Sequence, residues 1–207
     1  VLVSGRGSNL QALLDACADP AFPARIALVI SNVAGAYALE RAAAAGVPIL
    51  TIPHGDFPSR EAFDAEMDRH LRAAGIELVC LAGFMRLLSA GFVQGWQGRM
   101  LNIHPSLLPG FKGLHTHRRA LAAGVKLDGW WVHLGSPVLD DGALLVQGAG
   151  PGLTDDTEES LAARVLEQEH VAYPLALRLL AEGKVVVEGA RARVTAAGHG
   201  ALINPTP

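Results

Sequence analysis

Short apolar runs alternate with amphipathic segments along most of this chain. The apolar runs have the length of strands, and the segments between them place apolar side chains at helical spacing. The expected strands cover residues 1–3, 26–30, 47–52, 76–82 and 100–104, and the expected helices carry Leu10–Cys17, Tyr37–Ala45, Phe63–Ala74 after an N-cap at Ser59, and residues 117–123. This alternation predicts an α/β fold with a mostly parallel central sheet and helices on both faces. The run 76–82 is apolar throughout, so we expect it near the centre of the sheet.

Beyond residue 124 the pattern changes. Trp130–Leu134 and Ala143–Ala149 read as strands around a turn at Asp140-Asp141-Gly142, which predicts an antiparallel C-terminal extension of the sheet. A helix is expected at 157–170, with acidic residues in its first turn, and a separate helical stretch at 174–182 after Pro174. Residues 184–188 and 192–195 suggest a hairpin. We expect one domain over residues 1–197 and a loose tail at 198–207.

Composition narrows the class of protein. Half of the 207 residues are apolar and 18% are charged, which excludes a disordered chain and allows a substantial core. A formal net charge of −3 provides no electrostatic basis for binding nucleic acid or an anionic membrane. Cys17 and Cys80 stand in apolar contexts and read as core residues of a reduced compartment. With no apolar run near the ~20 residues of a membrane span and no signal peptide, we expect a soluble, cytoplasmic protein.

The strand at 100–104 ends in the first candidate for chemistry. Asn102 and His104 are two residues apart there, so both side chains should project from the same face. An amide can donate to a carbonyl oxygen that gains negative charge, and an imidazole can supply or accept a proton. The two side chains together therefore indicate a site for acyl transfer. A polar strand end that caps the following turn is the alternative.

A glycine-containing loop, Ser4–Leu10, joins the first strand to the first helix. The backbone N–H groups of Gly7, Ser8 and Asn9 should face outward at a helix N-terminus, an arrangement that suits a phosphate group. A simple strand-to-helix turn is the alternative. We do not expect NAD, because Leu10 replaces the third glycine of the dinucleotide fingerprint and Ser31-Asn32 supplies no acid for a ribose. Both this loop and the Asn102/His104 segment should open at the carboxyl ends of the strands.

Several histidines raise the question of a metal site. His115 and His117 are spaced by one residue, which is a weak metal signal, and neither cysteine has ligand spacing, so we expect no metal. A loop at 105–116 that closes over a substrate, with His115 or His117 helping to orient it, is favoured. His133 lies in an apolar strand and reads as a structural histidine.

Several motifs follow one another along the chain: SGRGSNL at 4–10, LAGFMR at 81–86, NIHPSLLP at 102–109, GLHTH at 113–117, Leu139-Asp140 with Gly142, and EQEH at 167–170. In this order they resemble the folate-dependent formyltransferase family, and most closely its phosphoribosylglycinamide formyltransferase (glycinamide ribonucleotide transformylase) branch. The NIHPSLLP block is shared by formyl-transferring and formyl-hydrolysing relatives. The glycine loop is more selective for the glycinamide ribonucleotide branch.

The resemblance implies a Rossmann-like domain that transfers a formyl group from 10-formyltetrahydrofolate to the amine of glycinamide ribonucleotide in purine biosynthesis. It implies no metal, no nucleic-acid or membrane partner, and a monomer or homodimer. The implied catalytic residues are Asn102, His104 and Asp140. The implied ribonucleotide ligands are Gly7, Ser8, Asn9 and Glu169, and the implied folate contacts are Arg60, Met85, Arg86, Leu87, Leu88 and Asp140.

The chain departs from the family pattern at Trp130-Trp131, at 134–138 and at the glycine-rich stretch 148–152. Adjacent strand residues point to opposite faces, so at least one indole should enter a space that a smaller side chain normally fills. Two other functions therefore remain open. One is a formyltetrahydrofolate hydrolase that uses the same three side chains, and the other is a non-catalytic module that binds folate or phosphate.

Overall fold

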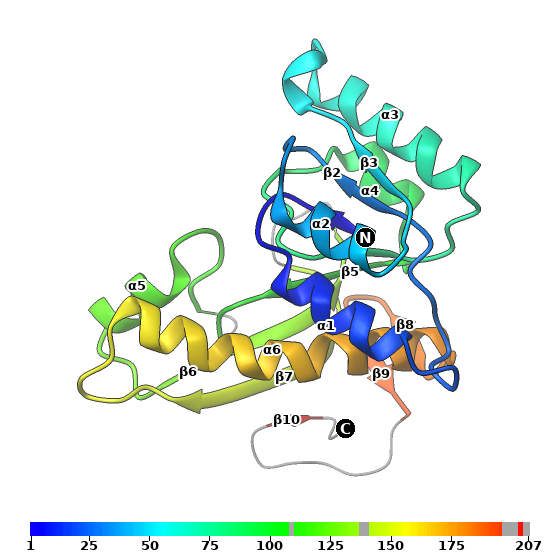
Figure 1. Cartoon of the computed structure of the whole chain (residues 1–207). Helices are drawn as coiled ribbons and strands as arrows, with labels where there is room; N and C mark the ends of the chain where they lie inside the picture. Colours follow the sequence, from blue (N-terminus) through cyan, green and yellow to red (C-terminus); the bar gives the residue numbers. More distant parts are fainter. Residues whose placement is uncertain (108–109, 137–140, 196–202, 205–207) are drawn as a thin grey trace. The chain divides into compact units, whose positions relative to one another are not determined.

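The computed structural model describes residues 1–107, 110–136 and 141–195, and the backbone of 203–204. The chain divides into two compact units. The first comprises Val1–Asn102 and Gly135–Pro137, and the second comprises Ile103–Leu134 and Val138–Pro207. The boundary between them falls inside one strand, β5 (Met100–His104). Figure 1 shows the course of the chain by colour.

A parallel sheet forms the centre of the first unit. Its strands are β1 (Leu2–Val3), β2 (Val29–Ser31), β3 (Ile49–Thr51), β4 (Val79–Leu81) and the first part of β5, in the order β5-β4-β1-β2-β3. Every pairing between them is parallel. The prediction of a mostly parallel sheet is confirmed, and β4 lies between β1 and β5 as its apolar sequence indicated. Strands β1 to β4 are shorter than the apolar runs that predicted them, whereas β5 has the predicted bounds.

Helices cover both faces of this sheet. They are α1 (Ser8–Cys17), α2 (Tyr37–Ala44), α3 (Arg60–Ala73) and α4 (Ala90–Gly95), with a 3-10 turn, η1, at His54–Asp56. Apolar side chains of α3 and α4, among them Met67 and Phe92, pack with Leu2 and Ile30 in one buried cluster. Strand residues alternate between faces, so Val3 and Val29 point to the other side, where α2 packs on β2 and β3. Ser59 caps α3 as expected, accepting a hydrogen bond from Ala62 N at 3.1 Å.

The second unit is built on antiparallel strands. β6 (Leu127–Leu134) pairs with β7 (Leu144–Pro151), and the hairpin of β8 (Val185–Glu188) and β9 (Arg191–Val194) forms a separate two-stranded sheet. The long helix α6 (Glu158–Ala181) runs along β6 and β7, and α5 (Thr116–Ala122) packs against α6 (Figure 1). The antiparallel extension and the hairpin are both confirmed.

One helix, α6, occupies the segment for which two helices were predicted. Pro174 lies inside it rather than between two helices. The buried face continues on both sides of the proline, through Leu161 and Val165 before it and Ala176 and Leu177 after it. Packing of that face on β6 and β7 outweighs the loss of one backbone hydrogen bond at the proline.

Part of the C-terminal range 198–207, expected to be loose, forms a strand. β10 (Ile203–Asn204) pairs antiparallel with β7, with Ile203 opposite Gly148. The other residues of that range lie outside the described residues. The expectation of a single domain over 1–197 stays a prediction.

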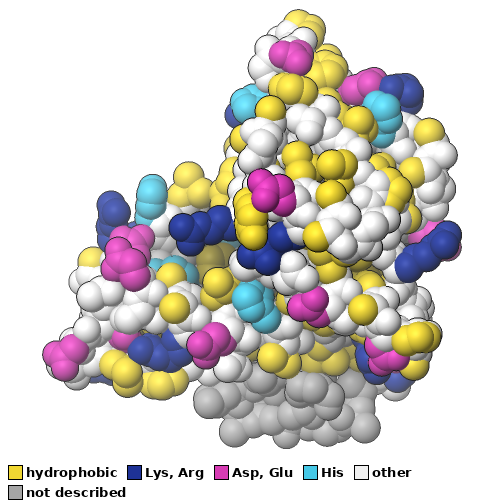
Figure 2. Space-filling view, viewed as in Figure 1, with side chains coloured by type: hydrophobic (Ala, Val, Ile, Leu, Met, Phe, Trp, Pro, Cys, Tyr) yellow, Lys and Arg dark blue, Asp and Glu magenta, His cyan; other side chains and the backbone are white. Residues whose placement is uncertain are grey.

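The distribution of charged side chains on the surface agrees with the small net charge of the chain (Figure 2). On the face seen in Figure 2, acidic, basic and apolar side chains are interspersed. No helix within the described part of the chain is long and apolar enough to span a membrane.

Candidate active site

Helix α2 is hydrogen-bonded to the glycine loop of the first unit. Ala38 N donates to the carbonyl of Gly5 at 3.0 Å, and Arg41 Nε donates to the carbonyl of Arg6 at 2.9 Å. Gly7 is in the left-handed region at φ 72°, and a Cβ added to it would lie 2.6 Å from the Cβ of Ala38. The loop carbonyls therefore turn toward α2, and the first N–H groups of α1, which begins at Ser8, have no acceptor within their own helix. This geometry is compatible with the predicted phosphate site.

A chain of polar contacts links the carboxyl ends of three strands in the same unit. Ser4, just after β1, donates from its hydroxyl to Asn32 Oδ1 at 2.5 Å, and its oxygen accepts from Met85 N at 2.8 Å. Asn32 follows β2, and its amide also contacts His54 Nδ1 at 3.2 Å. The predicted folate segment, which follows β4, is thereby tied to the residue that begins the glycine loop.

Arg60 is the first residue of α3, and the segment Met85–Leu88 is followed by a residue, Ser89, that is bonded to the same helix. Met85, Arg86 and Leu87 are exposed, with 69% of Met85 open to solvent. Asp64 accepts from Ser89 N at 2.6 Å, which fixes the chain just after Leu88. Burial raises the pKa of the Asp64 carboxyl, while the bond to Ser89 and the charge of Arg60 act in the opposite direction. Arg60 is thus close enough to influence a carboxylate that anchors the Met85–Leu88 segment.

Strand β5 carries the two catalytic candidates that the structure describes. Asn102 is half-buried and lies opposite Leu81 of β4 in the parallel ladder. His104 is buried, with 8% of its surface exposed, and its Nε2 donates to the carbonyl of Phe111 at 3.4 Å. Their separation by one residue within a regular strand agrees with the prediction that both side chains leave the same face. Asp140, the third catalytic candidate, lies outside the described residues.

Aromatic rings of the second unit surround His104. Trp131 meets it nearly edge-on, with ring centroids 6.2 Å apart and planes at 87°. Trp131 also stacks on His133, at 4.3 Å and 18°. The prediction that one indole of Trp130-Trp131 enters a space that a smaller side chain normally fills stays a prediction. Phe111, whose carbonyl faces His104, has a left-handed φ of 55°.

The other predicted residues of the second unit separate into different environments. Glu169 is buried at 5% exposure on the face of α6 that carries Leu161, Val165 and Tyr173. His115 is exposed, with a left-handed φ of 54°. His117 instead pairs with Asp128, whose carboxylate lies 2.9 Å from His117 Nδ1.

Sequence reasoning missed several of these partners. Asp128 is 1% exposed and also accepts from Gly129 N, so it anchors His117 of α5 to β6. A lone acid at the start of an apolar strand was the available signal. Ser4 and Asn32 were noted only as loop residues, although they join two strand ends. Within the described residues, no group of three or more His, Cys, Asp and Glu side chains could hold a metal ion.

Known proteins resemble this chain over most of its length. A family model described as formyl transferase matches residues 1–177. The chain belongs to the formyl transferase family. That family match covers the glycine loop, β5 and most of α6, and so includes every described residue predicted for the site.

Individual members of the family are similar over most of the chain. The phosphoribosylglycinamide formyltransferase of Escherichia coli is 45% identical over 185 residues, which are 89% of this chain and 87% of that protein. A crystal structure of glycinamide ribonucleotide transformylase 1 from Symbiobacterium toebii, 49% identical, superposes with a TM-score of 0.92 and covers 94% of this chain and 92% of that one.

A larger protein is also similar. The trifunctional purine biosynthetic protein adenosine-3 of Drosophila pseudoobscura pseudoobscura is 56% identical over 185 residues, or 88% of this chain. The match spans only 14% of the length of that protein.

Proposed function

We propose that this chain is a phosphoribosylglycinamide formyltransferase of purine biosynthesis. It transfers the formyl group of 10-formyltetrahydrofolate to the amine of glycinamide ribonucleotide. The observation that supports this most directly is the pair Asn102 and His104 on β5 within a chain of the formyl transferase family. The glycine loop held by α2 supports a substrate that carries a phosphate.

In the proposed reaction, the amine nitrogen of glycinamide ribonucleotide attacks the formyl carbon. The C–N bond to the substrate forms, the carbonyl oxygen becomes an oxyanion, and a tetrahedral intermediate results. Asn102 donates to that oxygen, and His104 stabilises it as a proton donor. Collapse of the intermediate breaks the bond to N10 of the folate, and the proton lost by the amine is delivered to N10. Asp140, directly or through a water, is the proposed carrier of that proton and the partner of the imidazole.

In this proposal the phosphate and the folate bind to different segments of the first unit, and one residue of the second unit, Glu169, contacts the ribonucleotide. Gly7, Ser8 and Asn9 hold the phosphate through backbone N–H groups at the start of α1, and Glu169 of α6 contacts the ribonucleotide. Arg60 and residues Met85 to Leu88 hold the folate. The hydrogen bond from Met85 N to Ser4 supports this arrangement, because it ties the folate segment to the start of the phosphate loop.

A coupled assay of folate product formation, with and without glycinamide ribonucleotide, tests the proposal. We expect turnover only in the presence of the amine substrate. Asn102→Ala, His104→Ala and Asp140→Asn should each lower kcat/KM by about 100-fold or more, because each removes a group that acts on the developing charge or the migrating proton. His70→Ala, which changes a histidine of α3 that pairs with Glu66, is the matched control and should stay within about 2-fold of the unmodified protein.

The assay also separates the alternatives. Folate turnover that is indifferent to glycinamide ribonucleotide would identify a hydrolase. Ligand binding without turnover would identify a binding module. Undiminished activity in His104→Ala would refute the mechanism.

A further inference from the structure

Trp131 occupies a central place among the buried aromatic rings of the second unit. It lies on β6 between His104 and His133, in an edge-on contact with the first and a stack on the second. The exposed fractions of the three side chains are 8% or less. The histidine that the proposed function makes catalytic is therefore packed against a buried indole.

The orientation of Trp131 follows from His133. His133 Nδ1 lies 2.8 Å from the carbonyl of Leu134. A carbonyl can only accept, so Nδ1 carries the proton and the plane of the imidazole is fixed to the backbone. Trp131 stacks on that plane, and Trp131 Nε1, which is buried, has no hydrogen-bond partner among the residues that the structure describes. Ring packing, rather than a polar contact within the described chain, thus sets the direction of the indole.

A backbone carbonyl and the indole both contact the His104 ring. The hydrogen bond from His104 Nε2 to the carbonyl of Phe111 is long, at 3.4 Å, and a bond of that length fixes the plane of a ring only loosely. The indole acts on the plane of the imidazole itself, because the edge-on contact at 6.2 Å favours one orientation of the two rings. Aromatic pairs with centroids 4.5–7 Å apart and perpendicular planes are also favourable in their own right.

We propose that Trp131 is a positioning residue that fixes the plane of the His104 ring for formyl transfer, with His133 as its backing. This inference rests on the proposed function. It gives Trp131 a role in kcat, because a ring misdirected by about 1 Å can lose about 100-fold in rate without any loss of substrate binding.

The test compares three variants in the formyl-transfer assay. Trp131→Leu keeps apolar bulk but removes the flat ring, and we expect kcat to fall roughly 10- to 100-fold while both KM values stay within about 2-fold. Trp131→Phe restores a flat ring and should recover kcat to within about 3-fold of the unmodified enzyme. Trp130→Leu is the matched control. Trp130 is equally buried but faces the other side of β6, against Gly148, so its loss should lower the melting temperature and leave kcat unchanged.

His133 supplies a second pair of variants, which decides the matter if Trp131→Leu does not fold. His133→Ala removes the surface on which the indole stacks and should lower kcat by about 3- to 10-fold, whereas His133→Phe retains a stacking ring and should restore it. A KM effect should be absent in both.

Two results would overturn the positioning role. One is an unchanged kcat in folded Trp131→Leu. The other is a raised KM with unchanged kcat in Trp131→Phe, because that outcome would make the indole N–H a substrate contact. Absence of turnover in the unmodified protein would instead refute the proposed function, and the inference with it.

Discussion

At the scale of single residues, Gly7 is the position where one added methyl group meets the backbone of a neighbouring helix. Its φ of 72° disfavours any other residue, and a Cβ there would lie 2.8 Å from the Cα of Ala38. Gly7→Ala should therefore push the loop away from α2 and disturb the N–H groups proposed to hold the phosphate. We expect at least a 10-fold increase in the KM for glycinamide ribonucleotide, with the KM for the folate unchanged, in steady-state kinetics.

Gly5 provides the control for that variant. It lies in the same loop, but no atom comes within 4 Å of a Cβ built on it. Gly5→Ala should leave both KM values within about 2-fold. If the two alanine variants behave alike, the close approach of the loop to α2 has no part in binding the ribonucleotide.

The residues that could be predicted from sequence are those whose geometry is local. The shared face of Asn102 and His104 follows from strand alternation, and the turn at Gly7 follows from a glycine between a strand and a helix. The pair of His117 and Asp128 could not be predicted, because its members lie on different elements and neither has a motif. The same holds for Ser4, whose partners follow β2 and β4.

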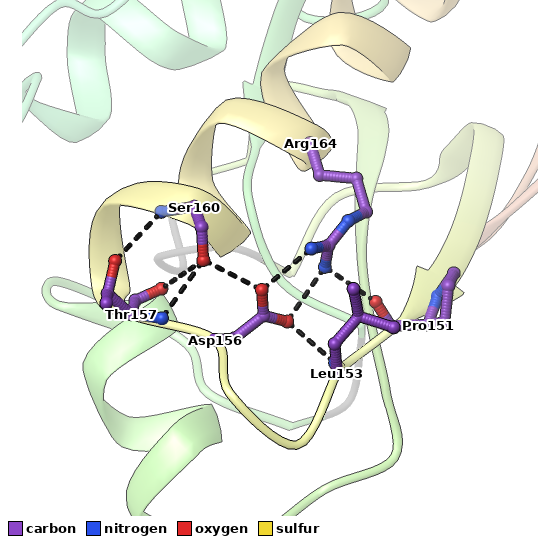
Figure 3. Close-up of polar contacts among 6 residues, drawn as sticks. All are labelled: Pro151, Leu153, Asp156, Thr157, Ser160 and Arg164. Atoms are coloured by element: carbon purple, nitrogen blue, oxygen red, sulfur yellow. Dashed lines mark hydrogen bonds and ion pairs between the residues drawn. The ribbon is translucent and has the colours of Figure 1, made fainter.

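At the scale of elements, the start of α6 depends on one carboxylate. Asp156 accepts hydrogen bonds from Leu153 N and Ser160 Oγ and pairs with Arg164 through both oxygens, and Thr157 caps the helix beside it (Figure 3). The hydrogen bond from Arg164, followed by that from Leu153 N, holds the pKa of Asp156 well below its usual 3.8. The ionised carboxylate therefore fixes the loop that leads from β7 into the helix.

Asp156→Asn should lower the melting temperature by about 3 °C at pH 7, because the amide cannot pair with Arg164 through two oxygens. A carboxylate whose pKa is lowered by folding stabilises the protein fully above its unfolded pKa, and that stabilisation is lost as the pH falls below it. The difference between the variant and the unmodified protein should thus shrink as the pH is lowered from about 4. Asp155→Asn, at the exposed neighbouring position, is the control and should melt like the unmodified protein. A difference that persists unchanged at low pH would contradict the role of the charge.

Prediction of the elements from sequence failed where packing overrides local signals. Pro174 marked the end of a helix in the sequence, yet α6 continues through it because the buried face of the helix is uninterrupted on both sides. β6 likewise begins at Leu127, before the apolar run that predicted it, since its partner β7 extends to Pro151 opposite that residue. The existence and type of these elements were predictable, and their ends were set by partners elsewhere in the chain.

At the scale of the whole molecule, the chain crosses between the two compact units more than once. The chain passes from the first unit to the second inside β5, returns to the first at Gly135–Pro137, and then leaves it again. Gly135 N donates to the carbonyl of Met100 at 2.7 Å, so the returning segment bonds to the same strand that crosses the boundary. The alternating sequence pattern indicated one α/β fold, but no local signal marks a division within a single strand.

This shared strand predicts that the two units unfold together. Releasing β5 from β4 in the first unit would also free the chain that enters the second at Ile103, so a state with one unit folded should not accumulate. The tryptophans allow a direct test, because Trp96 belongs to the first unit and Trp130 and Trp131 to the second. In Trp96→Phe, fluorescence reports the second unit alone while far-UV circular dichroism reports both. We expect the two urea transitions to coincide within error, and separate midpoints would mean that the strand does not couple the units.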